Sequence, residues 1–164
     1  MAEVVSSGMG TLGISHVAIG VSDMERALEF YRDLIGLRVT LDTVEGIADR
    51  GGEIRRRRAV YLRANDGPNE FFIVLDQQLD RPPFGNPPRL FQLGTHHFSF
   101  WVDNIDEVVA RADAAGFPLL VAPMSTKPAA YGETDDAQPV ITAILKDGDG
   151  NPVQLDQRAG SRFR

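Results

Sequence analysis

The chain contains an internal repeat, and this feature limits its fold more than any other. The segment LGISHVAIGVSDM, which contains His16, aligns with LGTHHFSFWVDNI, which contains His97, at an offset of 81 residues. A second pair of segments, Ile73–Gln77 and Val153–Gln157, aligns at an offset of 80 residues. Two separate matches at nearly one spacing indicate a tandem duplication. A chain of 164 residues is then expected to fold as two similar modules.

Each copy predicts a strand, a helix and three further strands. An alternating β-prone run opens each copy. Capping boxes that start at Ser22 and Asn104 predict where the helices begin, and Gly36 and Gly116 predict where they end. The sequence therefore predicts an α+β fold of two tandem βαβββ modules. The predicted strands cover residues 14–21, 37–43, 57–63 and 70–76 in the first copy, and 97–102, 119–122, 140–145 and 153–157 in the second.

The same pattern divides the chain into segments. We expect the modules at residues 12–80 and 93–158, with a Pro-rich linker over 81–92 between them. A loose leader over 1–11 and a tail over 159–164 complete the prediction. Inside the second module, the irregular segment over residues 125–139 is long enough to predict a lid or binding loop.

Composition excludes several classes of protein. The net charge of −6 argues against a nucleic-acid partner, because nucleic-acid binders usually carry positive charge. No cysteine is present, so a metal would have to use imidazole, carboxylate or amide ligands. No apolar run approaches the ~18 residues of a membrane helix, and the first residues do not resemble a secretory signal. We expect a cytoplasmic protein without membrane partners.

Three motifs resemble the vicinal oxygen chelate superfamily. They are HVAIGV from His16, the helix end FYxxLxGL over Phe30–Leu37, and DGDGNPVQL over Asp147–Leu155. That superfamily includes glyoxalase I, methylmalonyl-CoA epimerase, extradiol dioxygenases and bleomycin-resistance proteins. The resemblance implies paired modules whose curled mixed sheets form a cleft, with a divalent metal on its floor. It also implies a homodimer.

The resemblance further implies a set of metal ligands. The family's ligand positions on the first and last strands of each module fall here on His16, Val74, His97 and Gln154. Val74 cannot bind a metal, so His16, His97 and Gln154 would hold a divalent ion (Fe, Zn, Mn, Ni or Co), and two imidazoles with an oxygen suit such ions. Gln154 replaces the usual glutamate and cannot serve as a base. A register shift by one pair of residues would bring in an aspartate, Asp76 or Asp156, instead.

Strand alternation suggests residues that bind a substrate. Phe72, Val74 and Trp101 share a face with the expected ligands and would line an apolar cleft, which suits a small aromatic or aliphatic molecule. Within the run Arg55–Arg58, alternate side chains such as Arg57 would meet an anionic group of the substrate. The same run is typical of an exposed strand edge, where charge discourages pairing between chains, and we favour that interpretation.

Two residues are candidates for proton transfer. Tyr131, in the long loop of the second module, could reach over the cleft as an acid or a substrate clamp. Glu45 is a candidate base, as is Glu53 in the same segment. His96 is expected to point to the face opposite His97, as a packing or surface residue.

Two function hypotheses follow. A metal-dependent enzyme would act on a small substrate that chelates the ion through neighbouring oxygens, with dioxygenase-like ring cleavage slightly favoured over lyase or epimerase chemistry. The alternative is a metal-free protein that sequesters a small molecule, as bleomycin-resistance proteins do. We favour the enzyme, because paired cleft histidines have no evident packing purpose.

Overall fold

The computed structural model describes residues 13–67, 70–134 and 136–158, so the predicted leader and tail lie outside the described residues. The chain forms two four-stranded sheets with strand orders β1-β4-β3-β2 and β5-β8-β7-β6. In each sheet the first and last strands of the module pair in parallel, and the remaining pairs are antiparallel. The repeated topology confirms the predicted α+β fold of two tandem βαβββ modules.

The described helices and strands follow the repeat. The first module comprises β1 (His16–Gly20), α1 (Met24–Leu28), the π-helix η1 (Glu29–Leu34), β2 (Arg38–Ala48), β3 (Ile54–Arg63) and β4 (Phe72–Gln78). The second comprises β5 (Phe98–Trp101), α2 (Ile105–Ala114), β6 (Leu119–Thr126), the 3-10 helix η2 (Pro128–Tyr131), β7 (Val140–Lys146) and β8 (Pro152–Arg158). No described helix is long and apolar enough to cross a membrane.

Helix α1 begins at a different cap from the predicted one. The Asp23 carboxylate accepts hydrogen bonds from two free backbone N–H groups of the first turn, at 3.0 and 3.1 Å, so Asp23 is the N-cap. Ser22 instead donates its backbone N–H and its hydroxyl to Asp149, in the β7–β8 turn. Asn104 caps α2 as predicted. The first capping-box prediction was wrong because both Ser22 and Asp23 can cap a helix, and Asp149 engages Ser22.

The first helix widens before it ends. The turn η1 buries Phe30 and Tyr31 completely. Gly36 follows with φ of +90°, and Gly116 closes α2 with φ of +72°, which confirms both predicted left-handed helix ends. The buried hydroxyl of Tyr31 donates to Asp147 of the second module, at 2.8 Å.

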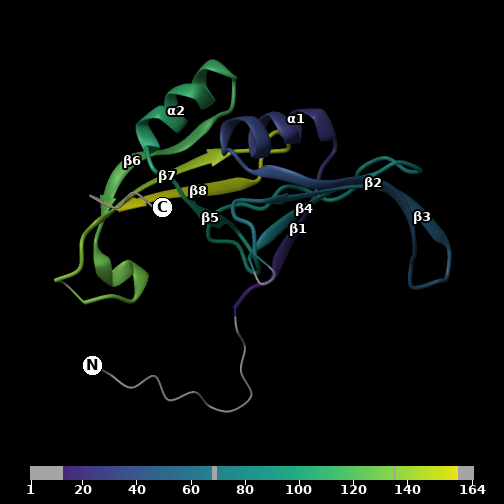
Figure 1. Ribbon diagram of the computed structural model, residues 1–164, viewed down its shortest axis with the longest axis horizontal. Coiled ribbons are helices and arrows are strands. Elements are labelled where there is room, and N and C mark those ends of the chain that lie inside the picture. Colours follow the sequence, from purple (N-terminus) through teal and green to yellow (C-terminus); the bar gives the residue numbers. More distant parts are fainter. Residues whose placement is uncertain (1–12, 68–69, 135, 159–164) are drawn as a thin grey trace, which may run out of the picture.

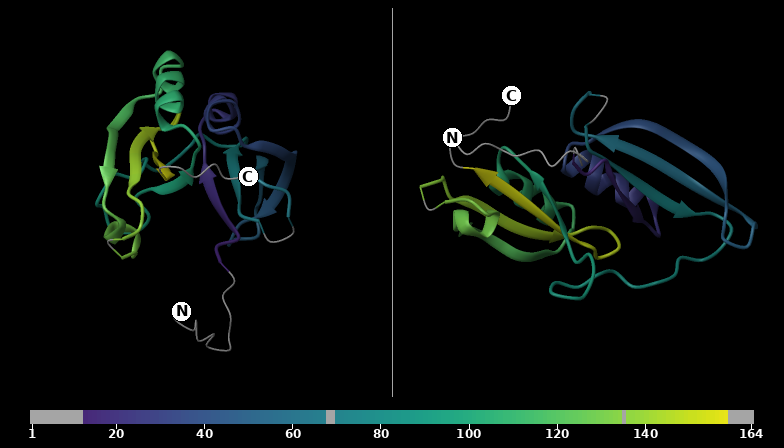
Figure 2. Two further views of the ribbon diagram at one scale, coloured as in Figure 1. Left: turned by 60° about the vertical axis from the view of Figure 1, so that its left-hand side comes forward. Right: turned by 90° about the horizontal axis from the view of Figure 1, so that it is seen from below.

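The two modules share one hydrophobic core. Buried side chains from both helices and from both sheets form a single cluster. At the module boundary the ring of Phe30 meets Phe117 edge to face at 5.0 Å, and the Arg26 guanidinium lies 3.7 Å above the same ring. Figures 1 and 2 show α1 and α2 side by side on one side of the molecule, with the sheets spreading beneath them. The other face of each sheet, which we call its open face, is turned away from the helices.

Candidate functional site

The open faces carry most of the predicted site residues. Directly paired residues share a face, and alternate residues such as Val60, Ile73 and Leu155 belong to the core cluster on the other face. The open face of the first sheet carries His16, Ala18, Glu45, Arg57, Phe72, Val74, Asp76 and Gln78. The open face of the second sheet carries Ser99, Trp101, Thr142, Gln154 and Asp156.

His16 begins β1 and is exposed. Its ring stacks on Phe72, with centroids 5.0 Å apart and planes 15° apart. Nδ1 of His16 lies 3.0 Å from the hydroxyl oxygen of Ser15. This contact occupies Nδ1, so Nε2 is the nitrogen with which His16 could bind a metal.

His97 lies immediately before β5 and is half-buried. Its Nδ1 is 2.8 Å from Nδ1 of His96, so Nε2 is again the nitrogen that could bind a metal. Burial and the neighbouring His96 lower the pKa of His97, which favours the neutral form that metals bind. The expectation that His96 points away was wrong, because both residues precede the strand and its alternation does not extend to them.

Gln154 and Asp156 form the polar centre of the second open face. The side-chain nitrogen of Gln154 donates to both carboxylate oxygens of Asp156, at 3.0 and 3.2 Å. Asp156 is 3% exposed and also accepts hydrogen bonds from the hydroxyls of Ser99, Tyr131 and Thr142. Because the amide nitrogen is directed at the carboxylate, the Gln154 oxygen is the atom that could bind a metal.

Tyr131 ends η2 and is directed at the sheet. Its hydroxyl donates to Asp156 at 2.7 Å, and its ring lies 6.0 Å from that of Trp101. Burial, with a further contribution from Asp156, raises the pKa of Tyr131 to about 12. At neutral pH Tyr131 is therefore a protonated donor that ties the loop to the sheet.

Arg57 lies between two carboxylates on the first open face. Its Nε and Nη2 donate to Oε1 of Glu45, at 3.0 and 2.7 Å, and its Nη1 donates to Asp76. The predicted substrate-binding arginine and the predicted base are therefore ion-pair partners. Both of these hydrogen bonds use Oε1 of Glu45, so Oε2 is the atom with which Glu45 could accept a proton.

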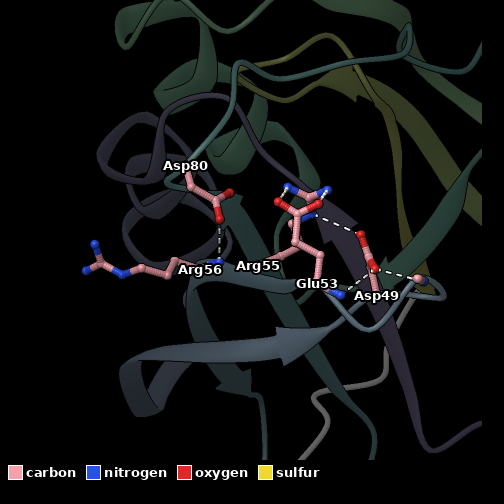
Figure 3. Close-up of polar contacts among 6 residues, drawn as sticks. Asp49, Glu53, Arg55, Arg56 and Asp80 are labelled. Atoms are coloured by element: carbon pink, nitrogen blue, oxygen red, sulfur yellow. Dashed lines mark hydrogen bonds and ion pairs between the residues drawn. The ribbon is translucent and has the colours of Figure 1, made fainter.

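The arginine run lies on an inner strand, because β3 is paired with both β2 and β4. The strand-edge interpretation of Arg55–Arg58 was therefore wrong. Near the β2–β3 turn, Figure 3 shows Asp49 and Glu53 both directed at Arg55, with contacts of 3.0 and 2.8 Å. The side chain of Arg56 extends away from them.

Two cavities of about 540 and 290 Å³ lie at the end of β4, and the larger one also reaches the end of β1. Asp76, Gln78 and Phe84 line both, so the linker covers this end of the first open face. Arg57 lines the smaller cavity, whereas the other predicted substrate residues, Phe72, Val74 and Trp101, line neither. Sequence reasoning missed Phe84, although an aromatic residue between prolines is a signal that could have indicated it.

The donor types present fit a divalent metal. His16, His97 and Gln154 each have one polar atom engaged by the protein, and each retains one nitrogen or oxygen of a kind that binds such ions. Within the described part of the chain, no three His, Asp or Glu side chains are grouped closely enough to hold a metal. Among the described residues, neither Asp76 nor Asp156 therefore forms such a group with the two histidines.

Comparisons with known proteins agree with this architecture. The model of the Glyoxalase/Bleomycin resistance protein/Dioxygenase superfamily matches residues 13–155. Mitochondrial methylmalonyl-CoA epimerase of Mus musculus is 30% identical over 153 residues, which cover 93% of this chain and 77% of that protein.

Solved structures with the same fold include a glyoxalase family protein and a glyoxalase I. A glyoxalase family protein of Bacillus cereus has a TM-score of 0.73 at 18% identity, covering 94% of this chain and 99% of that one. The trypanothione-dependent glyoxalase I of Leishmania major has a TM-score of 0.60 at 17% identity, covering 88% and 86%. Together with the duplicated topology and the match over most of the sequence, these findings establish that the chain belongs to the glyoxalase/bleomycin resistance protein/dioxygenase superfamily.

Proposed function

We propose that the chain is a metal-dependent enzyme that moves a proton at the carbon next to a carbonyl group, in a small substrate with neighbouring oxygens. The observation that supports this proposal is the atom that each of three side chains leaves unengaged. In both histidines Nδ1 contacts a neighbouring side chain, which leaves Nε2 to bind a metal. The nitrogen of the Gln154 amide is hydrogen-bonded to Asp156, which leaves Oε1 to bind a metal. The 30% identity to methylmalonyl-CoA epimerase favours epimerase-type chemistry over the ring cleavage that the sequence alone slightly favoured.

The residues would divide the chemistry between them. His16, His97 and Gln154 would hold a divalent ion, which would polarise the substrate carbonyl when bound. Glu45 would accept the proton through Oε2, because a carboxylate can act as a base where the amide of Gln154 cannot. Arg57 holds the Glu45 carboxylate through Oε1 and thereby fixes the direction of its other oxygen.

The proposal is tested by metal content and by hydrogen exchange. Purified protein is loaded with Co²⁺ or Zn²⁺, its bound metal is measured by mass spectrometry, and a methylmalonyl thioester is incubated with it in D₂O. We expect wild type to exchange the hydrogen between the carbonyls for deuterium. His16→Ala and His97→Ala should lose both metal and exchange. Glu45→Gln should keep the metal and lose at least about 100-fold in exchange rate.

Arg56→Ala is the matched control, because Arg56 lies on β3 with its side chain directed away from the neighbouring ion pairs. It should leave metal content and exchange unchanged. Wild-type protein that binds no divalent metal, or that binds metal without exchange on any small acyl thioester, would overturn the proposal.

One observation favours a second candidate, the metal-free binding protein. The larger cavity is lined by the aromatic ring of Phe84 and by polar side chains such as Gln78, and neither predicted histidine ligand lines it. An aromatic ligand that binds metal-free protein, and still binds after both histidines are replaced by alanine, would support sequestration. Phe84→Ala should then weaken its binding.

A further inference from the structure

Asp156 is a buried carboxylate surrounded by uncharged donors. Hydroxyls of Ser99, Tyr131 and Thr142 reach it from three different elements, and Gln154 reaches it from two positions earlier on its own strand. A carboxylate that is 3% exposed loses its hydration, so these donors replace the water that it would otherwise bind. Its position therefore depends on a complete set of donors.

The chemistry of this cluster determines which way the Gln154 amide points. A carboxylate can accept hydrogen bonds but cannot donate them, so a favourable contact with Gln154 requires the amide nitrogen. Turning the amide over would bring its carbonyl oxygen to about 3 Å from the oxygens of Asp156, where the two would repel. The amide oxygen is accordingly directed away from the carboxylate.

The first module provides an internal comparison. Asp76 occupies the place equivalent to Asp156, but the place equivalent to Gln154 is Val74, which has no polar group to orient. There the carboxylate contacts Arg57 and accepts a hydrogen bond from the side-chain amide of Gln78, at 3.1 Å. The three hydroxyl donors of Asp156 thus occur in the module whose amide stands at the predicted ligand position.

From these contacts we infer that Asp156 is a positioning residue, which fixes the Gln154 oxygen as a metal ligand and anchors the η2 loop through Tyr131. The first half of this inference rests on the proposed function, because it uses the role of Gln154 as a ligand. The second half does not. One buried carboxylate would then control both the ligand and the loop that lies over it.

The sharpest test exchanges the amide at position 154 with the carboxylate at position 156. Gln154→Glu alone places a second carboxylate against Asp156, and we expect a less stable protein without a gain in metal affinity. Adding Asp156→Asn again pairs one amide with one carboxylate. The amide at position 156 now donates, and the carboxylate at position 154 accepts. We expect this double variant to recover stability and to bind Co²⁺ at least tenfold more tightly than wild type, because its ligand is charged. Failure of the second substitution to rescue the first would overturn the inference.

Single variants supply the second readout. In Asp156→Asn, we expect the side-chain NH₂ signals of Gln154 in ¹⁵N NMR spectra to lose their protection from exchange with water. Co²⁺ affinity, measured by calorimetry, should fall 10- to 100-fold, the range typical of residues that orient metal ligands. Asp76→Asn, the matched control in the first module, should change that affinity less than threefold. Unchanged Gln154 signals and unchanged affinity in a folded Asp156→Asn protein would contradict the inference.

The two proposals fail in different ways. Wild-type protein that binds no Co²⁺ would overturn the proposed function, whereas the Gln154 signals would still report whether Asp156 holds the amide. Tyr131→Phe tests the loop separately: backbone amides of η2 should exchange with water at least tenfold faster than in wild type. Unchanged exchange in this variant would overturn the anchoring role.

Discussion

At the scale of single residues, Tyr31 shows how one hydroxyl joins the modules. Its side chain is fully buried in η1, and its hydroxyl donates to Asp147 in the β7–β8 turn, which also accepts hydrogen bonds from Asn151. Burial, followed by the charge of Asp147, raises the pKa of Tyr31 well above its ordinary value. The folded protein therefore holds this proton more tightly than the unfolded chain.

This difference predicts a loss of stability in alkaline solution. The stabilisation is fully present below about pH 10, where the tyrosine of the unfolded chain titrates, and declines as the pH rises toward the higher pKa of the folded state. The free energy of unfolding should fall by up to about 1.4 kcal/mol per pH unit from this group.

Tyr31→Phe should remove that pH dependence and cost about 1–2 kcal/mol at pH 7, because Asp147 loses one donor. Urea unfolding between pH 7 and 11 measures both effects. Tyr61→Phe, at a half-buried tyrosine of the first sheet, is the control. An equal alkaline slope in wild type and Tyr31→Phe would refute the assignment.

At the scale of elements, the sequence predicted which residues share a face of a strand better than it predicted which strands pair with each other. Alternation with a period of two placed Phe72, Val74 and Asp76 on one face, and the register confirms that grouping. The same rule failed at His96, which precedes the strand. It could not show that the arginine run lies on an inner strand, because pairing partners are distant in sequence.

Two features could not be predicted from the sequence pattern alone: the position of the linker and the ligand roles of the two histidines and Gln154. Phe84 lines both cavities, yet the Pro-rich segment has no periodicity that would place it there. The ligand roles of His16, His97 and Gln154 come from the resemblance, since spacing alone does not reveal which ring nitrogen or amide atom faces outward. Those details depend on neighbours such as Ser15 and Asp156.

The start of α1 supplies a prediction at this scale. Asp23→Ala should destabilise the protein by about 1 kcal/mol, because two backbone N–H groups lose their acceptor. Asp23→Asn retains a side-chain oxygen and should cost less. Thermal unfolding measures both. A larger loss in Ser22→Ala than in Asp23→Ala would show that the contact with Asp149 matters more than the cap.

At the scale of the whole molecule, the shared core makes the modules interdependent. Phe117 contacts both Phe30 and Arg26 of the first module, and Arg26 also donates to the backbone oxygen of Ala115 at 2.9 Å. A single cluster of buried side chains spans both sheets. We therefore expect the two modules to unfold together.

Phe117→Ala tests this cooperativity. Removing the ring should lower the free energy of unfolding by about 3–5 kcal/mol. The backbone amides of both sheets should then lose protection from hydrogen exchange together. Hydrogen exchange of backbone amides in β4 and β8 reports on the two modules separately. Loss of protection in β8 alone would show that the modules fold independently.

The Arg57 ion pairs and the donor-rich surroundings of Asp156 have a consequence for molecular recognition. The two modules share one topology, yet the first presents a guanidinium between two carboxylates and the second a carboxylate among hydroxyls. A compound that spans both modules would contact a guanidinium and carboxylates at one end, and a carboxylate with hydroxyls at the other. The repeat of the backbone topology therefore does not extend to binding, and even a compound with identical ends would be held differently at each end.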